Sequence, residues 1–118
     1  MNPCIICEAP GHSHHIVYRS HGGLDNKLNR IDLCPVHHNL GPDSPHRNHL
    51  VDISYKTRLQ AQYFELFEEG KEYSIKDIAG IIGMSERKVG EAFRKVNNNA
   101  GMYSQEDIVR RLMGGRLY

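Results

Sequence analysis

The spacing of apolar side chains in the second half of the chain follows the repeat of an α-helix. Between residues 52 and 69 the apolar positions fall mostly three or four apart rather than alternating, and Gly70 follows them. Residues 52–69 are therefore predicted to form one long helix. Three more amphipathic stretches, each preceded by a serine that can cap a helix, are predicted as helices over residues 75–82, 86–96 and 105–113.

The first half of the chain has short patterns typical of strands, separated by turn-forming residues. β-branched and aromatic side chains predict a strand over residues 15–19, a glycine pair ends it, and residues 30–33 are predicted as a second strand. A short helix is expected to begin near Pro35 and to stop at Gly41. Together with the helices that follow, these elements predict an α+β fold.

The composition divides the 118-residue chain unevenly, because every histidine and cysteine lies within the first 49 residues. Residues 1–50 are predicted to form one unit, residues 51–73 a linking and packing helix, and residues 74–118 a helical region. This last region has eight basic and five acidic residues, although the whole chain carries a net charge of only +1. The near-neutral total therefore conceals a modestly basic region.

Hydropathy and cysteine count exclude several classes of protein. No uninterrupted apolar run reaches the roughly 18 residues of a transmembrane helix, and the start lacks the basic-then-apolar pattern of a secretory signal. We therefore expect no membrane partner and a cytoplasmic location. Three cysteines cannot all pair, which favours a reduced, metal-binding role over a disulfide framework.

Two residue pairs have the spacing of a tetrahedral zinc site. Cys4-x-x-Cys7 and Cys34-x-x-His37 each bring two ligating side chains to one side of a tight turn. Four protein ligands fill the shell of Zn²⁺, so a structural zinc is predicted in a unit with little apolar surface to bury. His38 competes with His37 for the fourth place, but residues three apart on a helix share a face, which favours His37.

A further set of residues occurs in a fixed order around these pairs. The chain contains His14-His15-Ile16-Val17, then Gly22-Gly23, then Asn29, then Leu33-Cys34-x-x-His37-His38. In this order they resemble the HNH endonuclease family, the ββα-metal nucleases. The pattern is similar to the small phage-type members in which a zinc ribbon brackets the nuclease motif, and it covers roughly residues 4–49.

The resemblance implies a metal-dependent DNA endonuclease that hydrolyses phosphodiester bonds on a ββα-metal core. His15 would be the general base, because a neutral imidazole can accept a proton from water near neutral pH. Asn29 matches the family asparagine that fixes the loop opposite the base. His14 and His38 would hold one catalytic divalent ion, Mg²⁺ or another metal, and the products would carry 5′-phosphate and 3′-hydroxyl ends. The same resemblance implies a phage or prophage enzyme acting in the bacterial host cytoplasm.

The other histidines are assigned less sharply by their positions. His46 is either a third protein ligand of the catalytic metal or a surface histidine in a loop. His12 and His21 are expected to face solvent or phosphate. Because neighbours in a regular strand point to opposite faces, His14 is expected in a β-bulge or at the start of its strand, where it can reach the site of His15.

Basic residues indicate where DNA would bind. Residues 74–96 have the pattern of a helix-turn-helix, whose second helix would lie in the major groove. The candidates for contacts to DNA are Arg19, Arg30, Arg87, Lys88 and Arg94. The alternative for these helices is a small bundle that packs on the nuclease unit or on a second copy in a homodimer. For the whole chain, the alternative function is a non-catalytic zinc and helix-turn-helix DNA-binding regulator.

Overall fold

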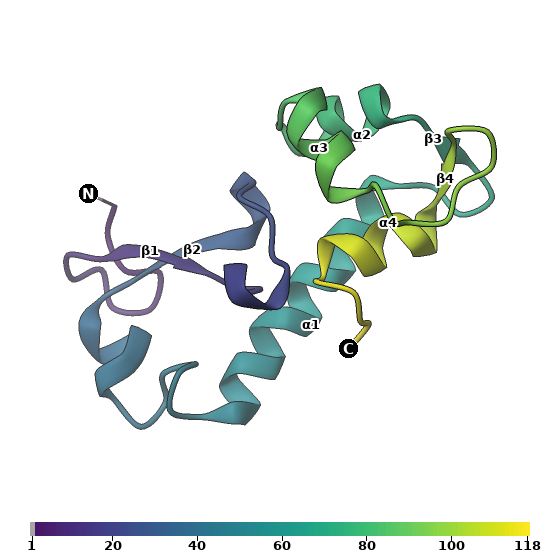
Figure 1. Cartoon of the computed structure of the whole chain (residues 1–118). Helices are drawn as coiled ribbons and strands as arrows, with labels where there is room; N and C mark the ends of the chain where they lie inside the picture. Colours follow the sequence, from purple (N-terminus) through teal and green to yellow (C-terminus); the bar gives the residue numbers. More distant parts are fainter. Residues whose placement is uncertain (1) are drawn as a thin grey trace.

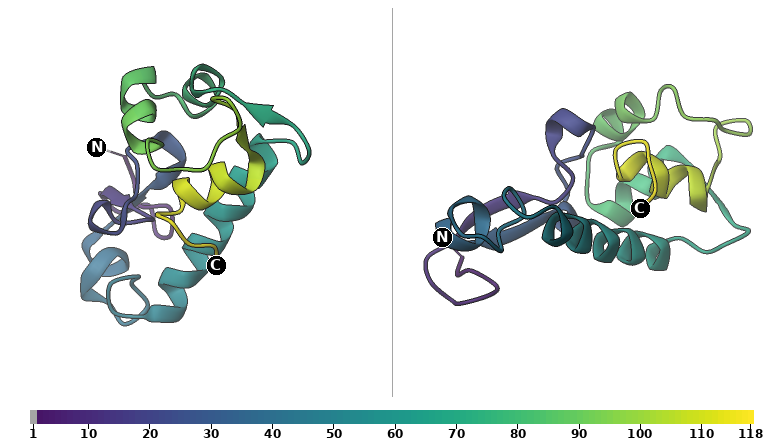
Figure 2. Two further views of the ribbon diagram at one scale, coloured as in Figure 1. Left: turned by 45° about the vertical axis from the view of Figure 1, so that its right-hand side comes forward. Right: turned by 90° about the horizontal axis from the view of Figure 1, so that it is seen from below.

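A long helix separates the two ends of this α+β protein, in the computed structural model that describes residues 2–118 (Figure 1). The elements are β1 (His12–His15), β2 (Arg30–Leu33), α1 (His49–Leu66), β3 (Glu72–Tyr73), α2 (Ile75–Ile82), α3 (Glu86–Ala92), β4 (Tyr103–Ser104) and α4 (Gln105–Leu112). The β1–β2 hairpin lies at one end of the molecule and α2, α3 and α4 gather at the other, with overall dimensions of 47 × 26 × 24 Å (Figure 2). The α+β class predicted from the sequence is confirmed.

The hairpin of β1 and β2 carries the histidine motif. The two strands pair antiparallel in uninterrupted register over their whole length. The second strand, at residues 30–33, is confirmed, but the first strand predicted over residues 15–19 is wrong, because β1 already ends at His15. Beyond it the side chain of Asn29 accepts a hydrogen bond from the backbone N–H of Val17 and donates one to its carbonyl, so a side chain replaces a strand partner.

The helix boundaries differ from the predicted ones where local capping decides them. Helix α1 begins three residues early because Asn48 caps it, and it also ends three residues early, at Leu66. Helix α3 ends at Ala92 rather than at residue 96. By contrast, α2 and α4 begin directly after the predicted serine caps, whose hydroxyls accept backbone N–H groups of the first turn. The small strands β3 and β4 were not predicted, because two residues are too few to show a pattern.

One hydrophobic cluster runs through most of the molecule. Ile16 and Val17, just after β1, are buried together with Leu59 and Tyr63 of α1 and with side chains of α2, α3 and α4. The division predicted at residues 50 and 73 stays a prediction, and apolar packing continues across both positions. Within residues 2–118, no helix combines the length and apolar character that spanning a membrane requires.

Candidate functional site

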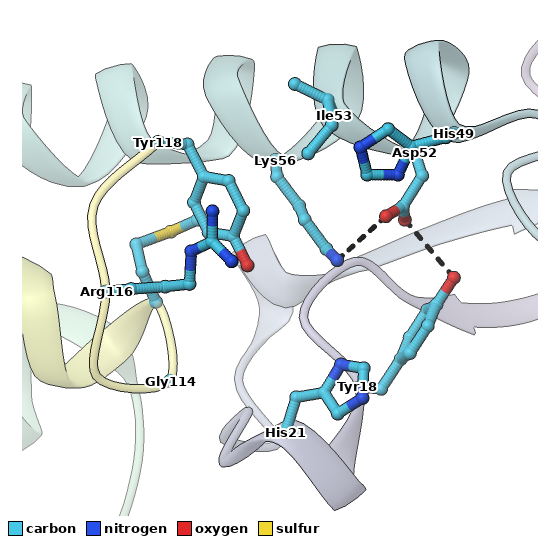
Figure 3. Close-up of a pocket in the computed structure, with 10 residues that line it drawn as sticks. Tyr18, His21, His49, Asp52, Ile53, Lys56, Gly114, Arg116 and Tyr118 are labelled. Carbon is cyan, nitrogen blue, oxygen red and sulfur yellow. Dashed lines mark hydrogen bonds and ion pairs between the residues drawn. The ribbon is translucent and has the colours of Figure 1, made fainter.

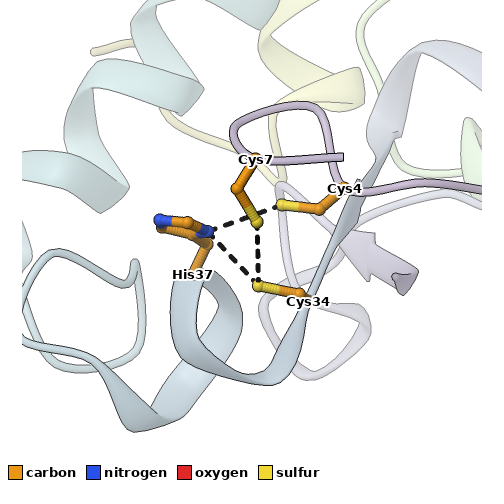
Figure 4. Close-up of side chains that lie close together, drawn as sticks. All are labelled: Cys4, Cys7, Cys34 and His37. Atoms are coloured by element: carbon orange, nitrogen blue, oxygen red, sulfur yellow. Dashed lines mark hydrogen bonds between the residues drawn. The ribbon is translucent and has the colours of Figure 1, made fainter. Parts of the chain in front are cut away.

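A tight loop before β1 brings the first two cysteines to the hairpin. The backbone N–H of Cys4 donates to the carbonyl of Ala9 at 2.8 Å, which closes the loop on itself. The N–H of Ile5 donates to the carbonyl of Asp32 in β2 at 2.9 Å, which fastens the loop to the sheet. Cys7 is thereby carried next to Cys34, the residue that follows β2 (Figure 4).

The four predicted zinc ligands form one cluster. The Sγ atoms of Cys7 and Cys34 lie 3.6 Å apart, and Nδ1 of His37 lies 3.3 Å from Sγ of Cys34 and 3.6 Å from Sγ of Cys4 (Figure 4). A tetrahedral ion with Zn–S bonds of about 2.3 Å requires ligand atoms about 3.7 Å apart. The predicted grouping is therefore confirmed, and the cluster could hold a metal ion such as zinc.

The backbone around this cluster favours thiolate. Burial alone raises the pKa of the Cys4 thiol, but backbone hydrogen bonds with Cys34, Cys7 and Ile6 outweigh it and lower the pKa to about 6. The pKa of Cys34 is also lowered, first by a backbone hydrogen bond with His37. Zinc binds the deprotonated thiol, so these hydrogen bonds favour the metal-binding form of Cys4 and Cys34. A backbone hydrogen bond with Ala9 lowers the pKa of Cys7, but burial and the neighbouring thiols outweigh it, so the pKa of Cys7 is raised instead.

One short helical turn serves two clusters. Residues Val36–Leu40 form a π-helical turn (η3), which closes with a 2.8 Å hydrogen bond from the N–H of Gly41 to the carbonyl of Val36. Adjacent positions on this turn point in different directions, so His37 faces the cysteines while His38 faces a separate group of histidines. The short helix predicted from Pro35 to Gly41 corresponds to this turn.

The second group consists of His14, His38 and His46. One nitrogen of each ring lies within 4.8 Å of the others, and the Nε2 atoms of His38 and His46 are 3.0 Å apart. His14 is only 3 % exposed, and among residues 2–118 its Nε2 atom finds no hydrogen-bond partner. A buried ring nitrogen without a hydrogen-bond partner costs about 1–3 kcal/mol, so an unpartnered imidazole close to two others fits a metal ligand.

The electrostatics of the group agree with that fit. Burial, followed by the neighbouring His38 and His46, lowers the pKa of His14 to about 4. Burial is also the first cause of the lowered pKa of His38, followed by His12 and His46. Both rings are therefore neutral near pH 7, which is the form that ligates metals.

The β-bulge expected at His14 is not present. His14 and His15 occupy consecutive paired positions of β1, opposite Ile31 and Arg30. Both nevertheless line the same cavity of about 460 Å³. Because β1 ends at His15, the chain turns there, and the alternation of faces that applies inside a strand no longer separates the two rings.

His15 has a partner that the sequence analysis missed. Its Nε2 atom lies 3.2 Å from Oδ1 of Asp25, in the loop between the strands, and Nε of Arg30 approaches the same oxygen at 3.6 Å. The pKa of Asp25 is lowered, first by its hydrogen bond with His15. Asp25 follows the glycine pair in a segment predicted to be a loop, and no periodic pattern pairs a loop residue with a strand residue ten positions away.

Asn29 holds that loop in place. Its buried Nδ2 group donates to the carbonyl of Leu24 at 2.9 Å and to the carbonyl of Val17 at 3.0 Å. Leu24 immediately precedes Asp25, so the amide links the end of β1 to the loop that carries the carboxylate. Gly23 has a related role, because a Cβ atom there would overlap the carbonyl of Val17.

Two histidines expected to face solvent or phosphate have ring contacts as well. His12 is exposed, yet its Nε2 atom is directed at Nδ1 of His38 and the two ring centroids are 4.4 Å apart. His21 is exposed and packs against the ring of Tyr18 at 5.2 Å. Tyr18 in turn stacks on His46, with centroids 5.2 Å apart and an interplanar angle of 16°.

The basic residues predicted to contact DNA are all exposed. Arg19 borders the histidine cavity, whereas Arg30 lies on β2. Arg87 and Lys88 lie in the first turn of α3, but Arg94 follows the end of that helix and is not on the predicted helical face. Contacts of these residues with DNA stay a prediction.

Comparisons with known proteins provide no family or function for this chain. No model of a protein family matches the chain, and no curated protein or solved structure matches it significantly.

Proposed function

We propose that this protein is a metal-dependent DNA endonuclease of the HNH type. The observation that carries the proposal is the meeting of His14, His38 and His46, with His15 beside them in the same cavity. These histidines come from β1, η3 and the loop before α1, and a purely structural role does not require an unpartnered buried imidazole among them.

His15 is the general base in this proposal. Its Nε2 atom is engaged with Asp25, which leaves Nδ1 with a lone pair to accept a proton from water. The water oxygen then forms a bond to phosphorus as the bond to the 3′ oxygen breaks. The leaving oxygen takes a proton from solvent, so the products end in 5′-phosphate and 3′-hydroxyl groups.

The residues that would hold the catalytic ion are His14, His38 and His46. When bound, a divalent ion such as Mg²⁺ or Mn²⁺ would neutralise negative charge on the phosphoryl and leaving oxygens. The Cys4, Cys7, Cys34 and His37 cluster would hold a structural zinc that fixes η3, and with it His38, against the hairpin.

Helices α2 and α3 are proposed to hold DNA while the hairpin cuts it. Gly83 ends α2 with φ of +73°, and Ser85 caps α3 with a hydrogen bond from the N–H of Lys88 at 3.2 Å. This short turn presents exposed basic residues at the start of α3, where they can contact phosphates or the major groove.

Nicking of supercoiled plasmid tests the proposal. We expect relaxation of the plasmid in Mg²⁺ or Mn²⁺, and DNA ligase should reseal the nicks because their ends are 5′-phosphate and 3′-hydroxyl. The basic start of α3 also fits the second candidate, a DNA-binding regulator without catalysis. Tight binding of plasmid without nicking in any divalent metal would favour that regulator.

A further inference from the structure

A second cavity adjoins the histidine cavity and shares Tyr18 with it (Figure 3). It encloses about 470 Å³ between the loop after β1, the first half of α1 and the segment after α4. This is within the usual range of about 300–1,000 Å³ for small-molecule sites. Its walls include the aromatic rings of Tyr18 and Tyr118 (Figure 3).

A buried ion pair forms part of the cavity wall. Nζ of Lys56 lies 2.8 Å from Oδ2 of Asp52, and the two residues are only 5 % and 7 % exposed. Asp52 also accepts a 3.2 Å hydrogen bond from the hydroxyl of Tyr18. A buried ion pair contributes little net stability compared with apolar side chains of similar size, so stability alone does not account for a charged wall here.

The cationic groups of the cavity lie close to its two tyrosine rings. The ammonium of Lys56 lies 4.9 Å from the ring centroid of Tyr18 and 5.5 Å from that of Tyr118, and Figure 3 shows it between the two rings. The guanidinium of Arg116 lies 4.7 Å from the Tyr118 centroid. The imidazoles of His21 and His49 also line the cavity, so its wall combines nitrogen-bearing side chains with aromatic faces.

Aromatic faces beside cations are the chemistry that binds an unpaired nucleotide. A base stacks on tyrosine without regard to sequence, and its phosphate pairs with lysine or arginine. The wall shared through Tyr18 places this cavity next to the histidines, so a strand crossing His14 and His38 can extend into it.

We propose that the cavity of Tyr18, Lys56, Arg116 and Tyr118 binds one unpaired nucleotide beside the phosphodiester that is cut. This inference rests on the proposed nuclease function and adds the class of substrate. DNA that already has an unpaired nucleotide is preferred over perfect duplex, because extruding a paired base from duplex costs additional free energy.

Binding of two duplexes that differ in one nucleotide tests this inference. The probes are a fluorescein-labelled perfect duplex and the same duplex with one unpaired thymidine, titrated by anisotropy without added divalent metal. We expect wild type to bind the second probe roughly tenfold more tightly, as stacking of one base provides. Equal affinity for both probes would overturn the inference.

Matched variants test whether the preference for the duplex with an unpaired thymidine comes from this cavity. Arg116→Ala and Tyr118→Ala should abolish most of it, whereas Arg110→Ala, an exposed arginine of α4 outside the cavity, should retain it. Tyr118→Ala leaves in place the two hydrogen bonds between Gln60 and the backbone of residue 118, at 2.6 and 2.9 Å. Equal losses in Arg116→Ala and Arg110→Ala would contradict the assignment.

Adding Mg²⁺ or Mn²⁺ to the same two probes separates this inference from the nuclease proposal. Preferential binding without cleavage supports the nucleotide site and refutes the nuclease. Cleavage of both probes at equal rates, with equal affinities, supports the nuclease and refutes the nucleotide site.

Discussion

His15 and Asp25 form a hydrogen-bonded pair, with Nε2 of the imidazole 3.2 Å from Oδ1 of the carboxylate. The carboxylate accepts the N–H of the ring, which fixes the tautomer in which Nδ1 is free. In the proposed mechanism it would also stabilise the imidazolium formed when Nδ1 accepts a proton. The proposed base therefore lies at the end of β1 and its carboxylate partner in the loop that follows, and the side-chain amide of Asn29 links these two segments.

Asp25→Asn is predicted to slow cleavage by roughly tenfold or more, because the amide cannot stabilise the imidazolium and can hold the ring in the wrong tautomer. Single-turnover cleavage of a labelled duplex measures the effect. Asp43→Asn, which changes an exposed carboxylate in the loop before His46, is the matched control. Similar rates for the two variants would remove Asp25 from the proposed mechanism.

Loss of the structural metal is predicted to unfold the hairpin end of the molecule. Cys4→Ser should lower the bound zinc well below one per chain and the melting temperature by more than about 10 °C. Zinc content by mass spectrometry and thermal unfolding by circular dichroism measure both. His15→Ala lies outside the cysteine cluster and should keep its zinc and its melting temperature. Equal destabilisation by Cys4→Ser and His15→Ala would contradict separate structural and catalytic roles for these residues.

The capping box of α2 predicts a dependence of stability on pH. The N–H and hydroxyl of Ser74 hydrogen-bond with Asp77 and hold the pKa of its carboxyl below the ordinary value. A carboxyl with a lowered folded-state pKa stabilises the fold above about pH 4, and this stabilisation is lost as the pH falls through the folded-state pKa. Asp77→Asn should thus be less stable than wild type at pH 6 in urea unfolding.

As the pH falls through the folded-state pKa of Asp77, this difference between Asp77→Asn and wild type should largely disappear, because the wild-type carboxyl is then protonated too. Asp43→Asn provides the comparison for a carboxylate in a loop. A constant difference between pH 6 and pH 3 would show that Asp77 acts without its charge.

The buried pair of Lys56 and Asp52 predicts a large single-substitution effect and a partial rescue. Lys56→Met should lower the free energy of unfolding by about 3–5 kcal/mol, because it leaves the Asp52 carboxylate buried without its cation. Adding Asp52→Asn should recover much of this loss, since an amide still accepts from Tyr18. Urea unfolding measures both variants, and a loss below about 1 kcal/mol would contradict the burial argument.

The start of α3 predicts a salt-dependent contribution to DNA binding. Arg87→Ala and Lys88→Ala should each weaken binding, and each should reduce the slope of log K against log salt by about one if it contacts a phosphate. Lys76→Ala, an exposed lysine of α2, is the matched control. Unchanged slopes in both α3 variants would favour the packing alternative for these helices.

The two pairs of candidate metal ligands could be predicted from sequence because each pair depends on local geometry. Cys4 and Cys7, like Cys34 and His37, lie within single turns whose spacing is fixed by the backbone. The caps at Ser74 and Ser104 were predictable for the same reason. The end of β1 was not, since the side chain of Asn29 reaches Val17 across twelve positions and replaces the strand ladder there.

The remaining residues around the site could not be predicted from the sequence, for a different reason. Asp25 contacts His15 from the loop between the strands, and Tyr18 contacts Asp52 from the segment after β1 to α1. No short-range pattern encodes such contacts. Lys56 and Asp52 resemble an ordinary exposed i, i+4 pair in sequence. Only the position of Tyr18 beneath the histidines reveals that this face of α1 is buried.

The central claim is that His15 accepts the proton of the attacking water beside a metal held by His14, His38 and His46. The most direct test is the single-turnover rate of DNA cleavage in Mg²⁺ or Mn²⁺ for wild type and for His15→Ala with equal zinc content and melting temperature. We predict measurable cleavage by wild type and a rate at least about 10²-fold lower for the variant. Equal rates for the two proteins would contradict the claim.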